Sequence, residues 1–198
     1  MYVRTLPVGP LTTNCYLIEI SESSCFVVDP GDEGDYISEK ILKSRLSPLA
    51  ILLTHAHFDH VLGLLPLHLN FPDTPIFLHP LDQFLYNQAV KSAKYWVSHY
   101  TPDPLPKVKL LSPLKHSFEG LKTIHSPGHT PGSVSYYFPT LKSLFPGDTL
   151  TQEPVNTSHK YSSLADLTHS HLVLKSLPPS TIVYPGHGQS FAIPPKEK

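Results

Sequence analysis

Four side chains able to bind a metal ion lie within six residues, directly after the apolar run at residues 49–53; they are His55, His57, Asp59 and His60. In a strand, side chains alternate with period two, so His55 and His57 point to the same face. If the chain then turns into a helix, the other two side chains aim back toward the same space. The pattern predicts two neighbouring sets of ligands and hence two metal ions, with a histidine-rich loop in solvent as the alternative.

Three later segments share a second pattern, in which an apolar stretch is followed by Pro-Gly and then by one histidine or aspartate. These final residues are His129, Asp148 and His187. Proline and glycine fix a sharp turn and let the backbone come close to a bound group. A single Pro-Gly-His segment is more typical of a surface turn. Three such turns beside the histidine-rich segment indicate one shared pocket.

The motifs resemble a known family along nearly the whole chain. They are residues 8–16 (VGPLTTNCY), 28–31 (VDPG), 125–133 (HSPGHTPGS), 145–150 (FPGDTL) and 186–188 (GHG). The chain resembles the metallo-β-lactamase-fold hydrolase superfamily and, within it, the glyoxalase II-like group (hydroxyacylglutathione hydrolases). The resemblance implies an α/β (α+β) fold, an αββα sandwich of two mixed β-sheets flanked by helices, with the metals at one edge between the sheets.

The resemblance also implies a ligand set. One metal ion would be held by His55, His57 and His129, the other by Asp59, His60 and His187, and Asp148 would bridge both. Imidazoles and carboxylates suit Zn, Fe and Mn, so two divalent ions are expected, with Zn favoured and Fe or Mn as alternatives. Asp29 is expected to orient a ligand histidine, as carboxylates commonly do; a simple turn role is the alternative.

The activity implied by the resemblance is hydrolysis of a thioester, foremost a hydroxyacylglutathione such as S-lactoylglutathione, by a metal-bound hydroxide. Asp59 would orient this hydroxide or move its proton. Asp148 points to the thioesterase-like branch, because several groups of true lactamases have cysteine there. The alternatives are a mononuclear-iron persulfide dioxygenase and a lactone hydrolase. Asp148 and the lack of a visible signal peptide count against β-lactam hydrolysis.

The chain departs from glyoxalase II in two places. It is expected to form a single domain over residues 1–198, without the basic C-terminal extension that binds glutathione, since only eleven residues follow His187. After the FPGDTL motif, residues 152–158 contain neither the glycine nor the arginine often found there. The polar linker that follows supplies the predicted substrate contacts, which are His159, Lys160 and Tyr161.

The charge balance bears on the partners. The formal net charge is −1, and nucleic-acid-binding proteins usually carry a basic face, so a small-molecule thioester is expected rather than a nucleic acid. No apolar run approaches the roughly 20 residues that span a membrane, and no secretory signal is visible, which predicts a cytoplasmic protein without a membrane partner. The oligomeric state is not predicted.

Alternating and β-branched runs predict the first strands, at residues 2–8, 14–20 and 24–28. The last two would form a hairpin in which Cys15 and Cys25 lie too far apart for a disulfide and are buried thiols. Residues 49–53 predict a strand buried on both faces.

Helices are expected over residues 36–44, 61–70, 81–90 and 165–177. Residues 87–115 are rich in aromatic residues and punctuated by proline. They are interpreted either as a lid over the pocket or as a helix and turn packed on the body of the protein.

Overall fold

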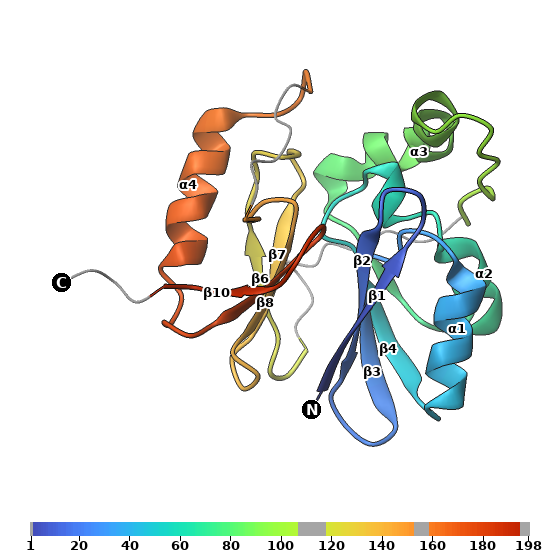
Figure 1. Cartoon of the computed structure of the whole chain (residues 1–198), viewed down its shortest axis with the longest axis horizontal. Helices are drawn as coiled ribbons and strands as arrows, with labels where there is room; N and C mark the ends of the chain where they lie inside the picture. The colour runs from blue at the N-terminus through green and yellow to red at the C-terminus, as the bar shows by residue number, and fades with distance from the viewer. Residues whose placement is uncertain (1, 107–117, 153–158, 195–198) are drawn as a thin grey trace.

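The computed structural model describes residues 2–106, 118–152 and 159–194. Two five-stranded sheets lie face to face, with helices on the outer face of each (Figure 1). This αββα arrangement confirms the predicted fold class. The two sheets meet along strands that are buried on both faces, so the helices outside and the facing sheet each cover one side.

The first sheet has the order β1-β2-β3-β4-β5. Its strands are β1 (Tyr2–Val8), β2 (Thr13–Glu19), β3 (Ser24–Val28), β4 (Ser47–Leu52) and β5 (Ile76–Phe77). The first three are antiparallel and the last two are added in parallel. The predicted hairpin is confirmed: Cys25 pairs with Glu19, and both Cys15 and Cys25 are free and buried.

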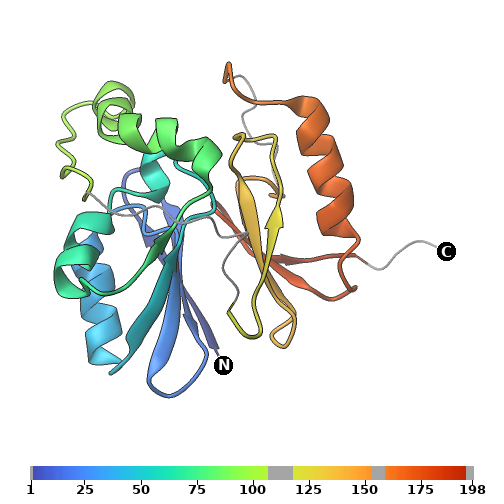
Figure 2. The same cartoon turned by 180° about the vertical axis from the view of Figure 1, so that it is seen from behind.

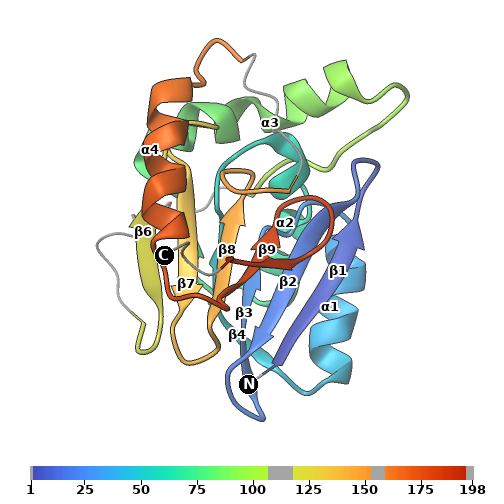
Figure 3. The same cartoon turned by 60° about the vertical axis from the view of Figure 1, so that its left-hand side comes forward.

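The second sheet has the order β10-β9-β8-β7-β6 and is also mixed, with β8 and β9 parallel. Its strands are β6 (Lys122–His125), β7 (Val134–Phe138), β8 (Ser143–Gly147), β9 (Ile182–Pro185) and β10 (Phe191–Ala192). Figure 3 shows β6 to β9 side by side. Strand β10 was not predicted, since two residues carry too little periodicity to recognise.

The helices are α1 (Gly34–Lys43), α2 (Leu64–Asn70), α3 (Gln83–Trp96) and α4 (Leu164–Lys175), with short 3-10 turns at Phe58–His60 and Pro80–Asp82. Helices α1 and α2 cover the first sheet, and α4 covers the second. Helix α3 lies across the upper end of the first sheet, as the view from behind shows (Figure 2). No helix in the described part of the chain is both long and apolar enough to cross a lipid bilayer.

On the central strands, the side chains of adjacent residues pack into different hydrophobic cores, one between the sheets and one under the helices. On β4, Ala50 and Leu52 pack between the sheets, whereas Ile51 packs under the helices. On β2, Ile18 and Leu17 divide in the same way. This follows from the period-two alternation of a strand and explains why the apolar run is continuous rather than alternating.

Two predicted helices were wrong in their bounds. The helix expected from residue 61 begins at Leu64, because Val61, which ends the preceding 3-10 turn, has φ −132° and lies outside the helical region of the backbone. The helix expected to end at residue 90 continues to Trp96. The helix interpretation of residues 87–115 therefore holds up to that point, and residues 107–117 lie outside the described part.

Candidate metal centre

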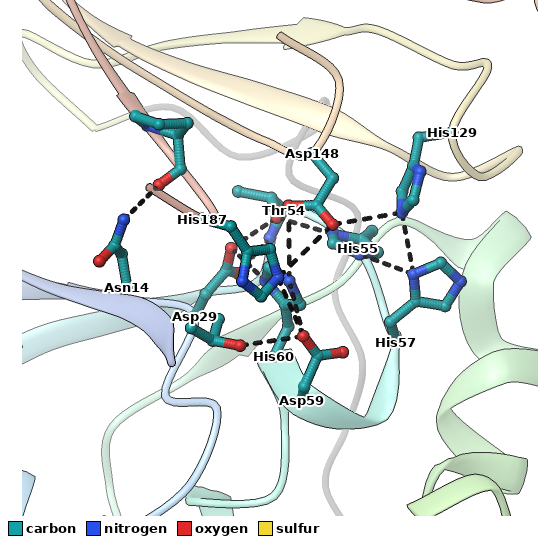
Figure 4. A network of polar contacts seen from close by, with 12 residues as sticks. Asn14, Asp29, Thr54, His55, His57, Asp59, His60, His129, Asp148 and His187 are labelled. Atoms are coloured by element: carbon teal, nitrogen blue, oxygen red, sulfur yellow. Dashed lines mark hydrogen bonds and ion pairs between the residues drawn. The ribbon is translucent and has the colours of Figure 1, made fainter. Parts of the chain in front are cut away.

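The seven predicted ligand side chains meet at one end of the sandwich, between the two sheets (Figure 4). The loop after β4 and the 3-10 turn at Phe58–His60 supply four of them from the first sheet. The second sheet supplies the other three from the loop between β6 and β7 and from the ends of β8 and β9. The carboxyl ends of β4, β8 and β9 thus face the same edge of the sandwich, although β4 belongs to one sheet and the other two strands to the second.

The first set consists of three imidazole nitrogens that converge on one point. His57 Nδ1 lies 3.0 Å from His55 Nε2 and 2.9 Å from His129 Nε2. Two nitrogens bound to one tetrahedral Zn ion at 2.0–2.1 Å would lie about 3.3 Å apart. The spacing therefore fits a shared cation. Burial is the main cause that lowers the pKa of His57 and of His129 to about 3, which keeps these lone pairs free to bind a metal.

The second set gathers around Asp59. Its Oδ2 atom lies 3.1 Å from His187 Nε2 and 3.5 Å from His60 Nε2. Burial opposes a charge on His60, but the carboxylates around it outweigh burial and raise its pKa to about 10. In a site without metal, this histidine is thus protonated and must release its proton when a metal ion binds.

Asp148 lies between the two sets. One oxygen is 3.5 Å from His129 Nε2 and the other is 3.7 Å from His60 Nε2. Among the described residues, Asp148 Oδ1 and His60 Nε2 are buried without a hydrogen-bond partner. Buried polar atoms without partners are costly, so this pair of orphaned atoms indicates that a ligand belongs between them. The donor set therefore fits two divalent cations.

Asp29 holds two of these histidines from behind. It accepts hydrogen bonds from the amide and the hydroxyl of Thr54 and lies 3.0 Å from His60 Nδ1. Since the Thr54 hydroxyl donates to Asp29, it can only accept from His55 Nδ1, which lies 3.0 Å away. Both histidines are then fixed by Nδ1, which leaves Nε2 free to bind a metal. The geometry is that expected of an orienting residue.

Glycine is required where the loops approach most closely. A Cβ atom on Gly186 would lie 2.2 Å from Asp148 Oδ1 and 2.7 Å from a ring carbon of His60. Gly147 has φ +54°, and a Cβ atom on it would lie 2.2 Å from Thr54 Oγ1. The Pro-Gly turns therefore let the ligand loops of both sheets come together, as their sequences suggested.

Asp82 joins the two loops of the first set and was not predicted from the sequence. It is fully buried and accepts hydrogen bonds from the amide of Ala56 at 3.1 Å, the hydroxyl of Thr130 at 2.7 Å and the amide of Gly132 at 2.7 Å. Ala56 lies between two ligands, and Thr130 follows His129. Burial raises the pKa of Asp82, while these hydrogen bonds oppose the shift.

Two further residues position the second set and were also missed. Thr13 donates its hydroxyl to Asp59 at 2.9 Å. The side chain of Asn14 donates to the carbonyls of Pro185 and Gly188, on either side of His187. Both lie in the VGPLTTNCY motif. The only available signal was a pair of polar residues at the start of an otherwise apolar strand.

The three predicted substrate contacts lie in different settings. Tyr161 Oη lies 2.8 Å from His57 Nε2, and the ring of His159 stacks on Tyr161 at 5.4 Å between centroids. Both line an open pocket of about 460 Å³ above the ligands. Lys160 is exposed and is not among the described residues that line this pocket. Their contact with a substrate stays a prediction.

Replacing Tyr161 with phenylalanine is expected to weaken metal binding by about tenfold, at the lower end of the usual loss for a group that orients a metal ligand. Since His57 Nδ1 faces the other ligands, Nε2 carries the proton that Tyr161 accepts. A metal titration monitored beside Tyr36→Phe, an exposed tyrosine on α1, measures the effect. Unchanged affinity in Tyr161→Phe would show that the hydrogen bond does not orient His57.

The fold and this cluster together define a class of proteins, the αββα hydrolases that hold metal ions between the edges of two sheets. The model of the metallo-β-lactamase superfamily matches residues 8–187, so the chain belongs to that superfamily. Its fold, its cluster of ligands and its relatives are those of a metal-dependent hydrolase.

Two curated relatives cover almost the whole chain. The Bacillus subtilis protein named Probable metallo-hydrolase YqgX is 34% identical, over 93% of this chain and 89% of that protein. The Haemophilus influenzae protein named Hydroxyacylglutathione hydrolase GloC is 27% identical, over 98% of this chain and 93% of that protein.

Two solved structures superpose closely. TTHA1623, crystallised in a di-iron-bound form, has a TM-score of 0.86 and 40% identity, and the match covers 96% of this chain and 95% of that one. The B3 metallo-β-lactamase BLEG-1 has a TM-score of 0.85 and 32% identity over 97% of this chain and 94% of that one. Relatives of similar closeness thus carry different names, so the family does not by itself define the substrate.

Proposed function

We propose that this protein hydrolyses thioesters with the help of two divalent metal ions. The narrower form of the proposal is an acylglutathione such as S-lactoylglutathione. The observation that carries it is the position of Asp148, whose carboxylate has one oxygen near each ligand set. In having a carboxylate at this position, the chain resembles the thioesterase-like branch of the family. The similarity to GloC supports the same activity.

His55, His57 and His129 would hold one ion and Asp59, His60 and His187 the other, and Asp148, which lies between the two sets, would bind both. Imidazoles and carboxylates favour Zn, and the di-iron form of TTHA1623 supports Fe as the main alternative. When bound, such ions lower the pKa of a water molecule to about 7 and polarise a carbonyl oxygen.

The protein's own side chains would complete the reaction. Asp59 lines the pocket, and in the metal-free site the charges of His60 and His187 lower its pKa against the opposing effect of burial. A bound cation would take the place of these charges and keep the carboxylate ionised. An ionised carboxylate beside the attacking water can orient it and accept its proton. Thr13 fixes the Asp59 carboxylate through Oδ2. The open side of the pocket admits the thioester carbonyl.

Removing the metals is expected to abolish hydrolysis, and adding back Zn, Fe or Mn should restore it. The test is metal content measured beside the rates for S-lactoylglutathione and simpler thioesters, before and after chelation. Undiminished hydrolysis by the chelated protein would contradict the proposal, as would a fully metal-loaded protein without thioesterase activity.

Hydrolysis of a β-lactam is a second candidate, favoured by the similarity to BLEG-1. A chromogenic β-lactam in the same assay separates the two activities. Both reactions cleave a bond between a carbonyl carbon and a heteroatom, but the ring nitrogen is a poorer leaving group than a thiolate. A thioesterase would therefore leave the β-lactam intact. Oxygen uptake with a persulfide would instead indicate the dioxygenase alternative.

A further inference from the structure

One face of α3 forms a wall of the pocket that holds the ligands. Leu85, Ala89, Ser92 and Trp96 all line it, and their spacings of four, three and four residues place them on a single face of the helix. The opposite side of the same pocket consists of ligand residues, including Asp59 and Asp148. The wall is thus continuous with the place where chemistry would occur.

Apart from Ser92 the wall is apolar, and it is buried at Leu85 and Ala89 but exposed at its outer end. Trp96 has 68% of its surface exposed, although it lines a pocket. Leu11 and Phe58 extend the apolar surface beyond the helix. Large apolar side chains that stay exposed around a cleft are typical of a surface that a ligand covers.

The pocket offers little to an anion apart from the metal ions themselves. Its described lining includes two carboxylates, Asp59 and Asp148, but no lysine or arginine. Lys91 and Lys94 are exposed on α3 and, like Lys160, are not among the residues described as lining the pocket. The two carboxylates of a glutathione moiety would therefore find no lysine or arginine among these residues, so the thiol portion gains little ionic recognition from the described lining.

We infer that the α3 wall binds an apolar acyl chain, so that the substrate class is fatty or otherwise hydrocarbon acyl thioesters, with the thiol portion recognised weakly. This deepens the proposed function and rests on it. The carbonyl lies over the ligands, the acyl chain runs along Leu85 and Ala89, and Trp96 covers its far end. The wall thereby determines specificity, whereas the ligands determine the reaction.

A two-way series of substrates tests the inference. Acetyl, butyryl, hexanoyl and octanoyl groups are each attached to glutathione and to the neutral thiol N-acetylcysteamine. With the metal-loaded protein, kcat/KM should rise with chain length by up to about fourfold for each methylene that the wall covers. The rise should be the same for both thiols, and S-lactoylglutathione should show a high KM.

Trp96 provides both a variant and a reporter. Trp96→Ala should lower kcat/KM for the octanoyl substrates by roughly tenfold, the worth of one lost apolar contact, and should affect the acetyl substrates far less because they are too short to span the wall. Leu172→Ala, an exposed leucine on α4, is the matched control. Because the chain contains one tryptophan, its emission should shift to shorter wavelength when a non-hydrolysable S-octyl thioether of N-acetylcysteamine binds.

The outcomes separate the two proposals. If no thioester is hydrolysed but the emission shifts with the octyl thioether and not with an ethyl one, the wall stands and the proposed function falls. If thioesters are hydrolysed but kcat/KM is independent of chain length, or glutathione esters are preferred more than a hundredfold at the same acyl group, the function stands and the inference is overturned.

Discussion

Replacing Asp148 with alanine is expected to lower the rate of thioester hydrolysis by about a thousandfold or more and to lower the metal content of the protein. A residue that touches both metal ions contributes several kcal/mol to the transition state, and each 1.36 kcal/mol is a factor of ten in rate. Its carboxylate lies 3.5 Å from His129 Nε2 and 3.7 Å from His60 Nε2, so both proposed sites would lose a ligand at once.

The informative comparison is with Asp29→Ala. Asp29 acts only through Thr54, His55 and His60, so its loss should cost about 10- to 100-fold in metal affinity or activity. Asp73→Ala, an exposed aspartate in a turn, controls for the change of charge. Rates and bound metal are measured for all three variants. Equal losses in Asp148→Ala and Asp29→Ala would show that Asp148 does not have a special place between the ions.

The ligand cluster was predictable from the sequence because its members are of a rare chemical type and follow strand ends. His55 and His57 lie in the loop after β4 rather than on a strand, so the period-two argument for them was wrong. They and Asp148, which follows β8, meet because both strands end at the same edge of the sandwich. The pattern predicted one shared pocket, and the division into two sets came from the resemblance to the family. Whether they bind metal stays a prediction.

The supporting residues were not predictable in the same way. Asp82 looks like any aspartate before a helix, and its three hydrogen bonds cross to residues 26, 48 and 50 positions away. The wall on α3 was hidden for a related reason. The sequence analysis placed the second half of α3 in an irregular aromatic segment, because the composition that follows is typical of turns. In the structure the stripe of buried side chains continues to Ala93, and the helix continues with it.

Asp82 connects these two features, because it precedes the first residue of α3 and binds both loops of the first ligand set. Asp82→Asn is therefore expected to destabilise the protein by about 1–3 kcal/mol, the cost of leaving one buried donor unpaired. Both carboxylate oxygens of Asp82 accept a hydrogen bond from a backbone N–H group. Whichever way the asparagine amide is turned, its NH2 group therefore faces another donor. Asp73→Asn is the matched control, with no buried partner among the described residues.

A purely structural role would lower the unfolding midpoint and leave the folded protein's metal site intact. We expect more, because Asp82 sets the distance between Ala56, which separates His55 from His57, and Thr130, which follows His129. In folded Asp82→Asn, the affinity for the first equivalent of Co(II) and its visible spectrum should change, because three histidines of that set are displaced relative to each other. The set around Asp59 and His187 is held by Thr13 and Asn14 instead, so its binding should persist. A destabilised variant with both Co(II) sites unaltered would confine Asp82 to folding.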